Sequence, residues 1–555
     1  MTIELHILDL VIIFLYFLAV FGVAYWASKS AGENSDQFFL AGRNLGWFVI
    51  GASLFASNIG SEHLIGLAGS GFSEGVPVAQ YEIWAGVILL LLGWVFVPFY
   101  LKSGVATMPQ FLELRYSNSA RTYLAVVSVI AYVLTKISVT IFAGGVVLEA
   151  IGMDFWVGAI LLVLATGIYT IFGGLRAVAY TDAMQMFVMI GGAIAVTYFG
   201  ITALGGWDEL WNITLQASSE SGNTNGSNSF FEIWKPKDHP NYPWTGILFG
   251  APILGIWYWC TDQFIVQRVL SAKNVQNARE GAIFAGFLKM LPLFLFVIPG
   301  IIAFALYQKG LLPSMPVVNG EAESNKALPA LVKDVLPIGL RGLVVAGLFA
   351  ALMSSLSSMF NSSSTLITLD FYQKFRPNAG QKELVNAGRI STMLLVLFSL
   401  LWIPVIQSGA LSNQLFLYLQ SIQAYISPPI AAVFLLGIFI KRLNGRGAMA
   451  ALITGFVLGL LRFLLEIIKK TSLESGSPFY LFADINFLHF AILLFVICSA
   501  VLIVVSLLTS PPSPEQVEHV TYGDKFDREN ISKKDIILSI LLLAFIFILW
   551  AILKG

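Results

Sequence analysis

The stretch SNIGSEHLIG, residues 57–66, interrupts an otherwise apolar run of the sequence. A helix that spans a membrane needs about 20 predominantly apolar residues, yet this run carries Asn58, Glu62 and His63 near its centre. If the helix unwinds near Gly60, backbone carbonyls become free to bind a cation and side chains become free to bind a solute. The alternative is a kinked helix whose polar groups pack against neighbouring helices.

The composition of the whole chain is that of a membrane protein. Of its 555 residues, 57% are hydrophobic and only 12% are charged, whereas soluble globular proteins have about 25% charged residues. Apolar runs long enough to form spanning helices recur along the sequence, without the alternation of apolar and polar residues that is typical of β-barrels. The expected fold class is therefore an all-α polytopic membrane protein. The formal net charge of zero predicts no general attraction to nucleic acid.

These runs predict about fourteen transmembrane helices. Their approximate ranges are 7–28, 45–73, 80–101, 121–151, 155–173, 178–204, 244–266, 278–307, 328–370, 388–407, 411–439, 446–468, 482–508 and 534–553. Lys and Arg, with Arg268 among them, are concentrated in alternate connections, which are usually cytoplasmic. Both termini and the polar segment 205–243 are then extracellular or periplasmic. We expect that segment to be a loop without a core of its own, and the protein to lie in a plasma membrane, with the compact loops favouring a bacterial inner membrane.

A second polar interruption lies in IWYWCTDQF, residues 256–264, which contains Asp262. Its aromatic residues Trp257, Tyr258 and Trp259 suit a sugar ring, because aromatic faces pack on apolar faces while polar edges form hydrogen bonds. The alternative is a belt of aromatic residues at the membrane interface. The two interruptions each open a set of five predicted spans, 45–204 and 244–439. Two equivalent broken helices in two halves indicate a secondary transporter built from inverted repeats.

Five further polar side chains fall inside predicted spans: Glu82, Lys136, Asp182, Lys289 and Gln420. A charged residue at the bilayer centre costs about 2.5–3.5 kcal/mol on insertion scales, so such residues usually face a cavity, a partner or a transport path. A site on a transport path is one interpretation of Glu82 and Lys289. An internal ion pair without a role in binding is the other.

A serine-rich run, SSLSSMFNSSST, lies inside a later span. Its residues Ser354, Ser355 and Ser358 share one helix face with Ala351, because they follow it at three, four and seven positions. Hydroxyl and carbonyl oxygens suit sodium, which is a hard cation. Close packing of helices through small residues is the alternative. Since no nucleotide-binding loop, metal-binding His/Cys cluster or nucleophile–base pair is visible, we expect coupling to an ion gradient and no enzyme activity.

Long motifs in this order along the chain resemble the sodium/solute symporter family, and its sodium/glucose cotransporter branch in particular. The motifs are FFLAGRNLGWFVIGASLFASNIGSEH, GGLRAVAYTDAMQ, WYWCTDQFIVQRVLSAKN, SSLSSMFNSSSTLITLDFY and PPIAAVFLLGIFIKR. The resemblance implies a ten-helix (5+5) inverted-repeat core of the LeuT type, with broken first and sixth core helices. The implied divisions are 1–43 for one extra helix and a linker, 44–204 for the first repeat, 205–243 for the extracellular loop, 244–440 for the second repeat and 441–555 for three further helices.

The resemblance also implies a role for individual residues. A sugar would be bound by Asn58, His63, Glu82, Tyr258, Trp259, Lys289 and Gln420. Outer gates would be Leu67, Tyr81 and Phe416, and Tyr258 would be the inner gate. A first sodium would be bound by Ala56, Ile59, Ala351, Ser354 and Ser355, and a second by Asp182, Ser357 and Ser358. Glu62 receives no role.

The function implied is sodium-coupled import of a monosaccharide such as glucose or galactose by alternating access, with two sodium ions for each sugar. Gly255 stands where relatives have Asn or Thr, and Gln423 stands where a Thr is found, so the identity of the sugar stays open. The alternatives are a symporter for myo-inositol or for another small solute such as sialic acid, and, in another class, a solute sensor or a sodium-leak channel. The implied partners are a sugar or polyol, sodium and the lipid bilayer, without an organic cofactor, nucleic acid or obligatory protein partner.

Overall fold

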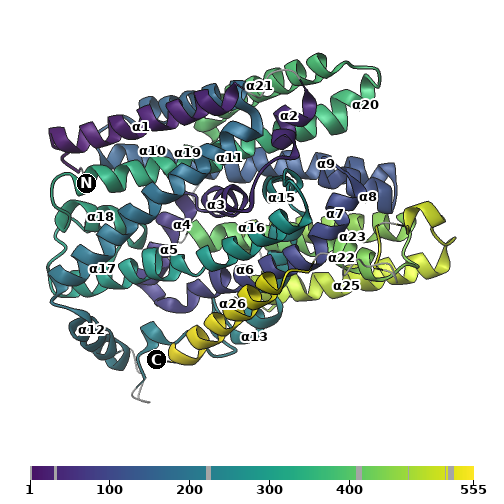
Figure 1. Ribbon diagram of the computed structural model, residues 1–555. Coiled ribbons are helices and arrows are strands. Elements are labelled where there is room, and N and C mark those ends of the chain that lie inside the picture. The colour runs from purple at the N-terminus through teal and green to yellow at the C-terminus, as the bar shows by residue number, and fades with distance from the viewer. Residues whose placement is uncertain are drawn as a thin grey trace.

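The computed structural model describes residues 3–29, 34–220, 227–407, 415–472, 474, 476–518, 520–522 and 531–554. Long helices dominate this part of the chain, and most of them run along the horizontal direction of Figure 1. Ten helices in the described residues are long and apolar enough to cross a membrane. Their outward faces carry large apolar side chains, as expected for helices that lipid surrounds.

Residues 7–204 form helices α1 to α11, which pack in the upper and central parts of Figure 1. Their bounds are α1 Ile7–Ser28, α2 Ser35–Leu40, α3 Trp47–Asn58, α4 Ser61–Leu64, α5 Gly66–Glu74, α6 Gln80–Leu91, α7 Val97–Ser103, α8 Met108–Arg115, α9 Asn118–Ala131, α10 Ser138–Ala150 and α11 Phe155–Leu204. π-helical turns at Leu92–Phe96 and Tyr132–Ile137 continue α6 and α9 into the helices that follow.

Residues 207–439 form helices α12 to α22. Their bounds are α12 Trp207–Glu220, α13 Trp244–Phe249, α14 Ala251–Gly255, α15 Gln263–Leu270, α16 Val275–Leu288, α17 Ile298–Gln308, α18 Ala327–Asp334, α19 Leu340–Leu366, α20 Gln373–Phe375, α21 Gln381–Gln407 and α22 Leu415–Phe439. Strands β1 Val317–Val318 and β2 Glu321–Ala322 form an antiparallel hairpin between α17 and α18. π-helical turns lie at Ile256–Thr261, Leu293–Val297 and Ile367–Tyr372.

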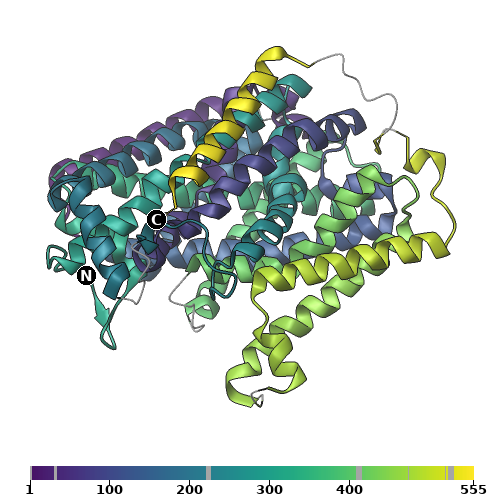
Figure 2. The same ribbon diagram turned by 90° about the horizontal axis from the view of Figure 1, so that it is seen from below.

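Four more helices complete the fold: α23 Gly445–Ser472, α24 Pro478–Asp484, α25 Phe487–Leu508 and α26 Lys533–Ile552. Figure 2 shows α23 and α25 as a pair at one edge, where both pack against α22. The last helix, α26, lies on another side of the molecule and packs against α16 and α6. Both termini lie toward the end of the molecule that also carries α12 (Figure 1).

The interruption predicted near Gly60 is present. Helix α3 ends at Asn58, and Ile59 leaves the helical conformation with a ψ of 88°. The Gly60 N–H then donates to the Asn58 carbonyl at 2.9 Å instead of to the Ala56 carbonyl one turn earlier. The chain resumes as α4 and α5, so carbonyls at the end of α3 are released from the helical hydrogen-bond pattern.

A second interruption separates α14 and its π-helical turn from α15. Asp262 has an extended conformation, with a ψ of 124°, and its carboxylate accepts a hydrogen bond from the Phe264 N–H at 3.2 Å. Asp262 is therefore the N-cap of α15, which explains why the break falls at this residue. Both polar interruptions of the sequence are thus breaks between helices.

Helix α11 contains a sharp bend at Gly174, which has a φ of +57° and a ψ of −160°. A side chain there would be strained in this conformation, and its Cβ would lie 2.5 Å from the Phe38 carbonyl oxygen. The bend divides α11 at the point where the sequence predicts the boundary between 155–173 and 178–204.

The sequence predicts that the segment 205–243 is a loop throughout. This prediction is wrong for residues 207–220, which form α12. Trp207, Leu210 and Trp211 recur at helical spacing, which the high content of Ser, Asn and Gly further on conceals. Leu210 is buried, and Phe231 stacks on Trp211 with ring centroids 5.1 Å apart. Leu210 and Phe231 both belong to the main hydrophobic core, so the segment packs on the long helices and not around a separate core.

Candidate functional site

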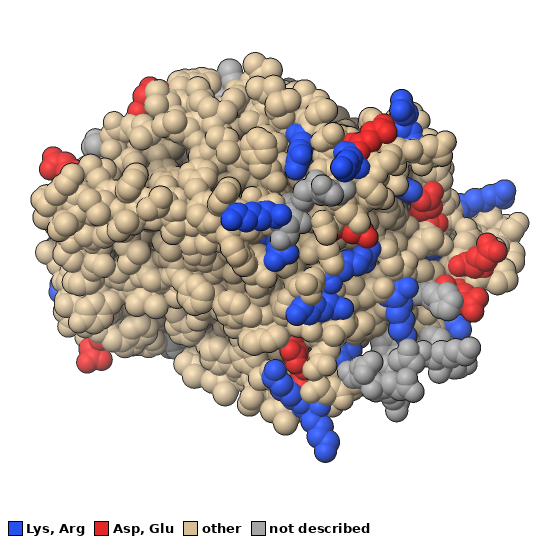
Figure 3. All heavy atoms as spheres, turned by 45° about the horizontal axis from the view of Figure 1, so that its top comes forward, with Lys and Arg blue, Asp and Glu red and all other residues tan. Residues whose placement is uncertain are grey.

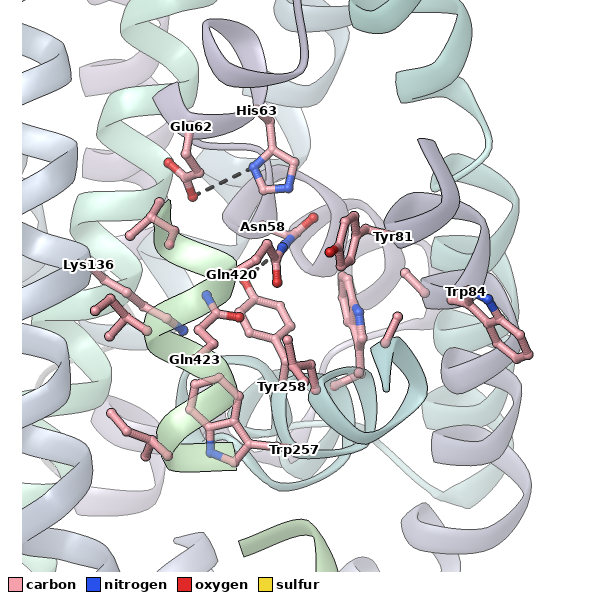
Figure 4. Close-up of a pocket in the computed structure, with 18 of the residues that line it drawn as sticks. Asn58, Glu62, His63, Tyr81, Trp84, Lys136, Trp257, Tyr258, Gln420 and Gln423 are labelled. Carbon is pink, nitrogen blue, oxygen red and sulfur yellow. Dashed lines mark hydrogen bonds and ion pairs between the residues drawn. The ribbon is translucent and has the colours of Figure 1, made fainter. Parts of the chain in front are cut away.

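A pocket opens between the two helix breaks, α6, the turn Tyr132–Ile137 and α22 (Figure 4). Its empty volume, including the space at its open side, is about 1120 Å³. It is lined by polar and aromatic side chains, and we call it the solute pocket: Asn58, Glu62, His63, Tyr81, Glu82, Trp84, Tyr132, Lys136, Trp257, Tyr258, Trp259, Gln420 and Gln423, with apolar residues between them.

Six of the seven predicted sugar-binding residues line the solute pocket: Asn58, His63, Glu82, Tyr258, Trp259 and Gln420. The seventh, Lys289, is fully buried behind the lining. Its ammonium group forms an ion pair with the Glu82 carboxylate and donates a hydrogen bond to the Asn58 side-chain oxygen. Lys289 is therefore placed to hold two lining residues in position.

The two helix breaks meet at the solute pocket. The Asn58 side-chain amide donates to the Tyr258 hydroxyl at 2.9 Å, which joins the end of α3 to the turn before α15. The Tyr258 ring packs edge-on against Trp259, with centroids 5.1 Å apart. Residues that are 200 positions apart in the sequence thus form one wall.

His63 lies between two carboxylates. Its Nδ1 is 3.6 Å from a Glu62 oxygen and its Nε2 is 3.4 Å from a Glu82 oxygen. Figure 4 shows Glu62 and His63 together at one end of the pocket, with Trp257 and Gln423 toward the other end. The lining therefore offers both hydrogen-bond donors and acceptors, as recognition of several hydroxyl groups requires.

A second ion pair, between Lys136 and Asp262, lies beside Tyr258. The Lys136 ammonium lies 2.8 Å from an Asp262 oxygen, and the Tyr132 hydroxyl donates to the other Asp262 oxygen. Lys136 also lies over the Tyr258 ring, 4.4 Å from its centroid, which is a favourable cation–π contact. The sequence marks Lys136 and Asp262 as polar residues inside spans but does not pair them.

The predicted gate residues are in different surroundings. Tyr81 and Tyr258 line the solute pocket, whereas Leu67 is fully buried in α5 and is not among the lining residues. The side chain of Phe416 lies outside the part of the chain that the structure describes.

Oxygen atoms from α3 and α19 gather beside the first helix break. The Ser354 hydroxyl donates to the Ala56 carbonyl at 2.7 Å, and it lies 3.3 Å from the Ala351 carbonyl. The Ser355 hydroxyl donates to the Ser57 carbonyl at 3.2 Å. Residues predicted for the first sodium are thereby brought together, and Ile59 lies at the break itself.

The residues predicted for the second sodium lie nearby on α11 and α19. Asp182 is fully buried, and one carboxylate oxygen accepts hydrogen bonds from Ser53 at 2.6 Å and Ser57 at 2.9 Å. Its other oxygen has no hydrogen-bond donor among the described residues. Ser358 donates to the Ser57 hydroxyl at 3.1 Å, whereas Ser357 donates to the Ser354 carbonyl at 3.1 Å.

Arg268, which is among the basic residues expected in a cytoplasmic connection, is fully buried. Its guanidinium lies 3.6 Å from the Asp182 carboxylate and donates to the Ser53 hydroxyl at 3.1 Å and to Ser358. The apolar residues on both sides of Arg268 in α15 are the signal that could have suggested burial.

Three tryptophans connect the wall of the solute pocket to the C-terminal helix and to the segment before α13. Trp84 lines the pocket, and its ring lies 5.5 Å from that of Trp550 in α26. Trp550 donates to Gln80 at 2.9 Å and lies 5.5 Å from Trp234. The C-terminal helix is therefore in contact with the helix that forms this wall.

Comparison with known proteins gives close relatives over most of the chain. Sodium/glucose cotransporter 1 of Oryctolagus cuniculus is 42% identical over 527 residues, which cover 91% of this chain and 79% of that protein. Sodium/myo-inositol cotransporter 2 of Homo sapiens is 40% identical over 536 residues, covering 94% and 79%.

Solved structures share the fold. A Na⁺-coupled sialic acid symporter in a substrate-bound, outward-open state matches with a TM-score of 0.75 at 22% identity, over 91% of this chain and 99% of that one. Mhp1, a transporter of the nucleobase-cation-symport-1 family, matches with a TM-score of 0.54 at 13% identity, over 88% and 98%. The chain therefore has the same overall fold as these two transporters. The family model described as the sodium:solute symporter family matches residues 38–455. On this match and these relatives, the chain belongs to the sodium:solute symporter family.

Proposed function

We propose that this protein imports a monosaccharide by sodium-coupled symport. The observation that carries the proposal is the linked set of Glu82, Lys289 and Asn58 in the wall of the solute pocket, directly beside the released carbonyls of the first helix break. Such groups recognise hydroxyls selectively, because a solute without the matching hydroxyl leaves them unpaired. The names of relatives, which include sodium/glucose cotransporters, support a sugar.

The same short segment carries ligands for both the ion and the solute. Ala56 and Ser57 offer carbonyls that hydroxyls of α19 already contact, and Asn58 follows directly as a lining residue of the solute pocket. Sodium at the break would therefore order the residues that meet the sugar. Glu82 and Gln420 would bind hydroxyls while Lys289 holds Glu82 in place, and none of the three would transfer a proton, in keeping with a family of transporters. The gradient supplies the work, since one charge crossing 100 mV gains about 2.3 kcal/mol.

Two sodium ions for each sugar form part of this proposal. The first would be bound by Ala56, Ile59, Ala351, Ser354 and Ser355. The second would be bound by Asp182, Ser357 and Ser358. The buried oxygen of Asp182 that lacks a donor among the described residues supports a cation there, because a carboxylate oxygen without a partner is costly.

We further propose fourteen spans and an inverted repeat. Ten helices in the described residues pass the length and hydropathy criteria for spanning. Two broken helices, the pair α9–α10 and the second part of α11 beyond Gly174 would bring the count to fourteen. The repeats would be 44–204 and 244–440, with the segment 205–243 between them and three helices after them.

The proposed orientation places both termini and α12 outside the cell. Lys and Arg side chains gather on the right of Figure 3, whereas its left side shows few of them. The termini lie toward the left in Figure 1, and the two views share their horizontal axis. Because basic connections are usually cytoplasmic, the right-hand end would face the cytoplasm of a cell with this protein in its plasma membrane.

Alternating access would use residues at both sides of the pocket. Tyr81, Leu67 and Phe416 would close it toward the outside, and Tyr258 would close it toward the inside. The Asn58–Tyr258 hydrogen bond supports this role for Tyr258, because moving one helix break would break the bond.

Myo-inositol is the second candidate solute. Gly255 and Gln423 line the pocket at positions where sugar-transporting relatives were expected to differ, and a relative at 40% identity is named a sodium/myo-inositol cotransporter. A polyol ring offers hydroxyls to the same groups.

The test is uptake by the purified protein in liposomes with an inward sodium gradient. Labelled glucose, galactose, myo-inositol and sialic acid are supplied separately, with a potassium gradient as the control. We expect concentrative uptake of one sugar or polyol that collapses with a sodium ionophore. Sodium current without concentrative uptake would instead indicate a channel, and binding without either would indicate a sensor.

A further inference from the structure

Glu62 is a charged residue of the solute pocket to which the proposed mechanism gives no role. Its side chain is 21% exposed and lines the pocket at the point where the chain resumes after the first helix break. The carboxylate lies in the space that a side chain at position 60 would occupy, so Gly60 makes this position available. Figure 4 shows Glu62 at the end of the pocket, beside His63.

The other buried charges around the pocket have partners of opposite charge. Lys289 pairs with Glu82, Lys136 with Asp262, and Arg268 with Asp182. Glu62 has only His63 within ion-pair distance among the described residues, at 3.6 Å. An imidazole balances a carboxylate only when it is protonated, and His63 also faces Glu82.

One oxygen of Glu62 is itself buried without a hydrogen-bond donor. This atom, Oε2, accepts no hydrogen bond from any described residue. A buried carboxylate oxygen without a donor is unfavourable, and a donor supplied by the solute would remove that cost. Because Glu62 has no Lys or Arg within ion-pair distance among the described residues, a protonated amine fits best, since it supplies both a donor and the missing countercharge.

We propose that Glu62 is a further solute-binding residue and that it makes the pocket select sugars with a protonated amino group over the same sugars without one. This inference rests on the proposed transport of sugars. The additional substrate would be an aminodeoxy hexose. The ammonium group of the sugar would bind Glu62, and the hydroxyls of the sugar would bind Glu82 and Gln420.

The experiment compares pairs of sugars that differ at one carbon. Aminodeoxy and deoxy forms of glucose, substituted at carbon 2, 3 or 6, compete at neutral pH with sodium-driven uptake of the labelled sugar that the liposome assay identifies. For the wild type we expect the amino form to inhibit at about tenfold lower concentration than the deoxy form at one of these carbons. Glu62→Gln should bring that ratio to about one, whatever its effect on the rate of uptake of the labelled sugar.

Glu209→Gln is the matched control, because Glu209 forms an exposed ion pair with Lys309 far from the pocket. If Glu62→Gln does not fold, Glu62→Ala provides the same comparison. The proposal is overturned if no carbon shows an amino preference in the wild type, or if the preference survives in the Glu62 variant. If the wild type concentrates no sugar, the proposed function fails, and the same pairs are then compared by their thermal stabilisation of the purified protein, which tests Glu62 separately.

Discussion

The carboxylate of Asp182 and the guanidinium of Arg268 lie 3.6 Å apart, and neither side chain is exposed to solvent. The Ser53 hydroxyl connects them, since it donates to Asp182 and accepts from Arg268. Helices α11, α15 and α3 are thus joined by one buried polar contact. This contact lies beside the proposed sodium ligands. It joins the three helices, and it would also affect the electrostatic potential at a bound cation.

Removing Arg268 alone should be strongly destabilising. Arg268→Gln leaves the buried Asp182 without its countercharge, and breaking a buried pair in this way costs about 3–5 kcal/mol. The double variant Asp182→Asn with Arg268→Gln should lose less stability than the two single variants together. Thermal unfolding of the purified proteins in detergent measures both effects, and strictly additive losses would show that the two groups do not interact.

Neutralising Glu82 should impair sugar transport. Glu82→Gln removes the ion pair with Lys289 and the charged acceptor for a sugar hydroxyl, which is worth about 1.5–3 kcal/mol. We therefore expect the half-saturating sugar concentration to rise at least about tenfold, with sodium gradients unchanged. Glu209→Gln should leave it unchanged, because that ion pair is exposed. If Glu82→Gln and Glu209→Gln gave the same half-saturating sugar concentration, Glu82 would not be a sugar-binding residue.

The first proposed sodium site depends on the hydroxyl of Ser354. Ser354→Ala removes an oxygen that contacts the Ala56 carbonyl, and losing one such interaction of about 1 kcal/mol should raise the half-saturating sodium concentration roughly fivefold. Ser363→Ala is the control on the same helix, because the Ser363 hydroxyl is buried and has no hydrogen-bond partner among the described residues. A sodium dependence that matches the control would contradict the assignment.

The second proposed sodium should be separable from the first. Ser357→Ala should lower the Hill coefficient of sodium-driven uptake toward one, since a single coupling ion gives no cooperativity. Initial rates over a range of sodium concentrations at saturating sugar provide this number. An unchanged coefficient above one would remove Ser357 from the second site, while a wild-type coefficient of one would remove the second ion.

The breaks in the helices could be predicted because their cause is local. A glycine with polar neighbours inside an apolar run, as at Gly60, is unfavourable in a continuous spanning helix. Asp262 caps the helix that follows it, which is also a short-range effect. The predicted sugar-binding residues that line the solute pocket are implied by the family resemblance and do not follow from such local effects.

Contacts between distant parts of the chain could not be predicted in this way. Arg268 precedes Lys273 and Arg279 in a stretch that is typical of a cytoplasmic connection, and only the fold brings it to Asp182. The pairing of Lys136 with Asp262 likewise depends on how the π-helical turn Tyr132–Ile137 packs against the second break. Helix α12 was missed because its apolar face is short and the segment around it is polar.

The row of indoles from Trp84 through Trp550 to Trp234 has a practical consequence for measurement. Tryptophan emission depends on the polarity around the ring, and Trp84 is in the wall that a solute would touch. Its neighbours lie within 5.5 Å of one another, close enough for excitation to pass from ring to ring. A solute that contacts this wall should therefore change the intrinsic fluorescence of the protein, which can be read without attaching a dye.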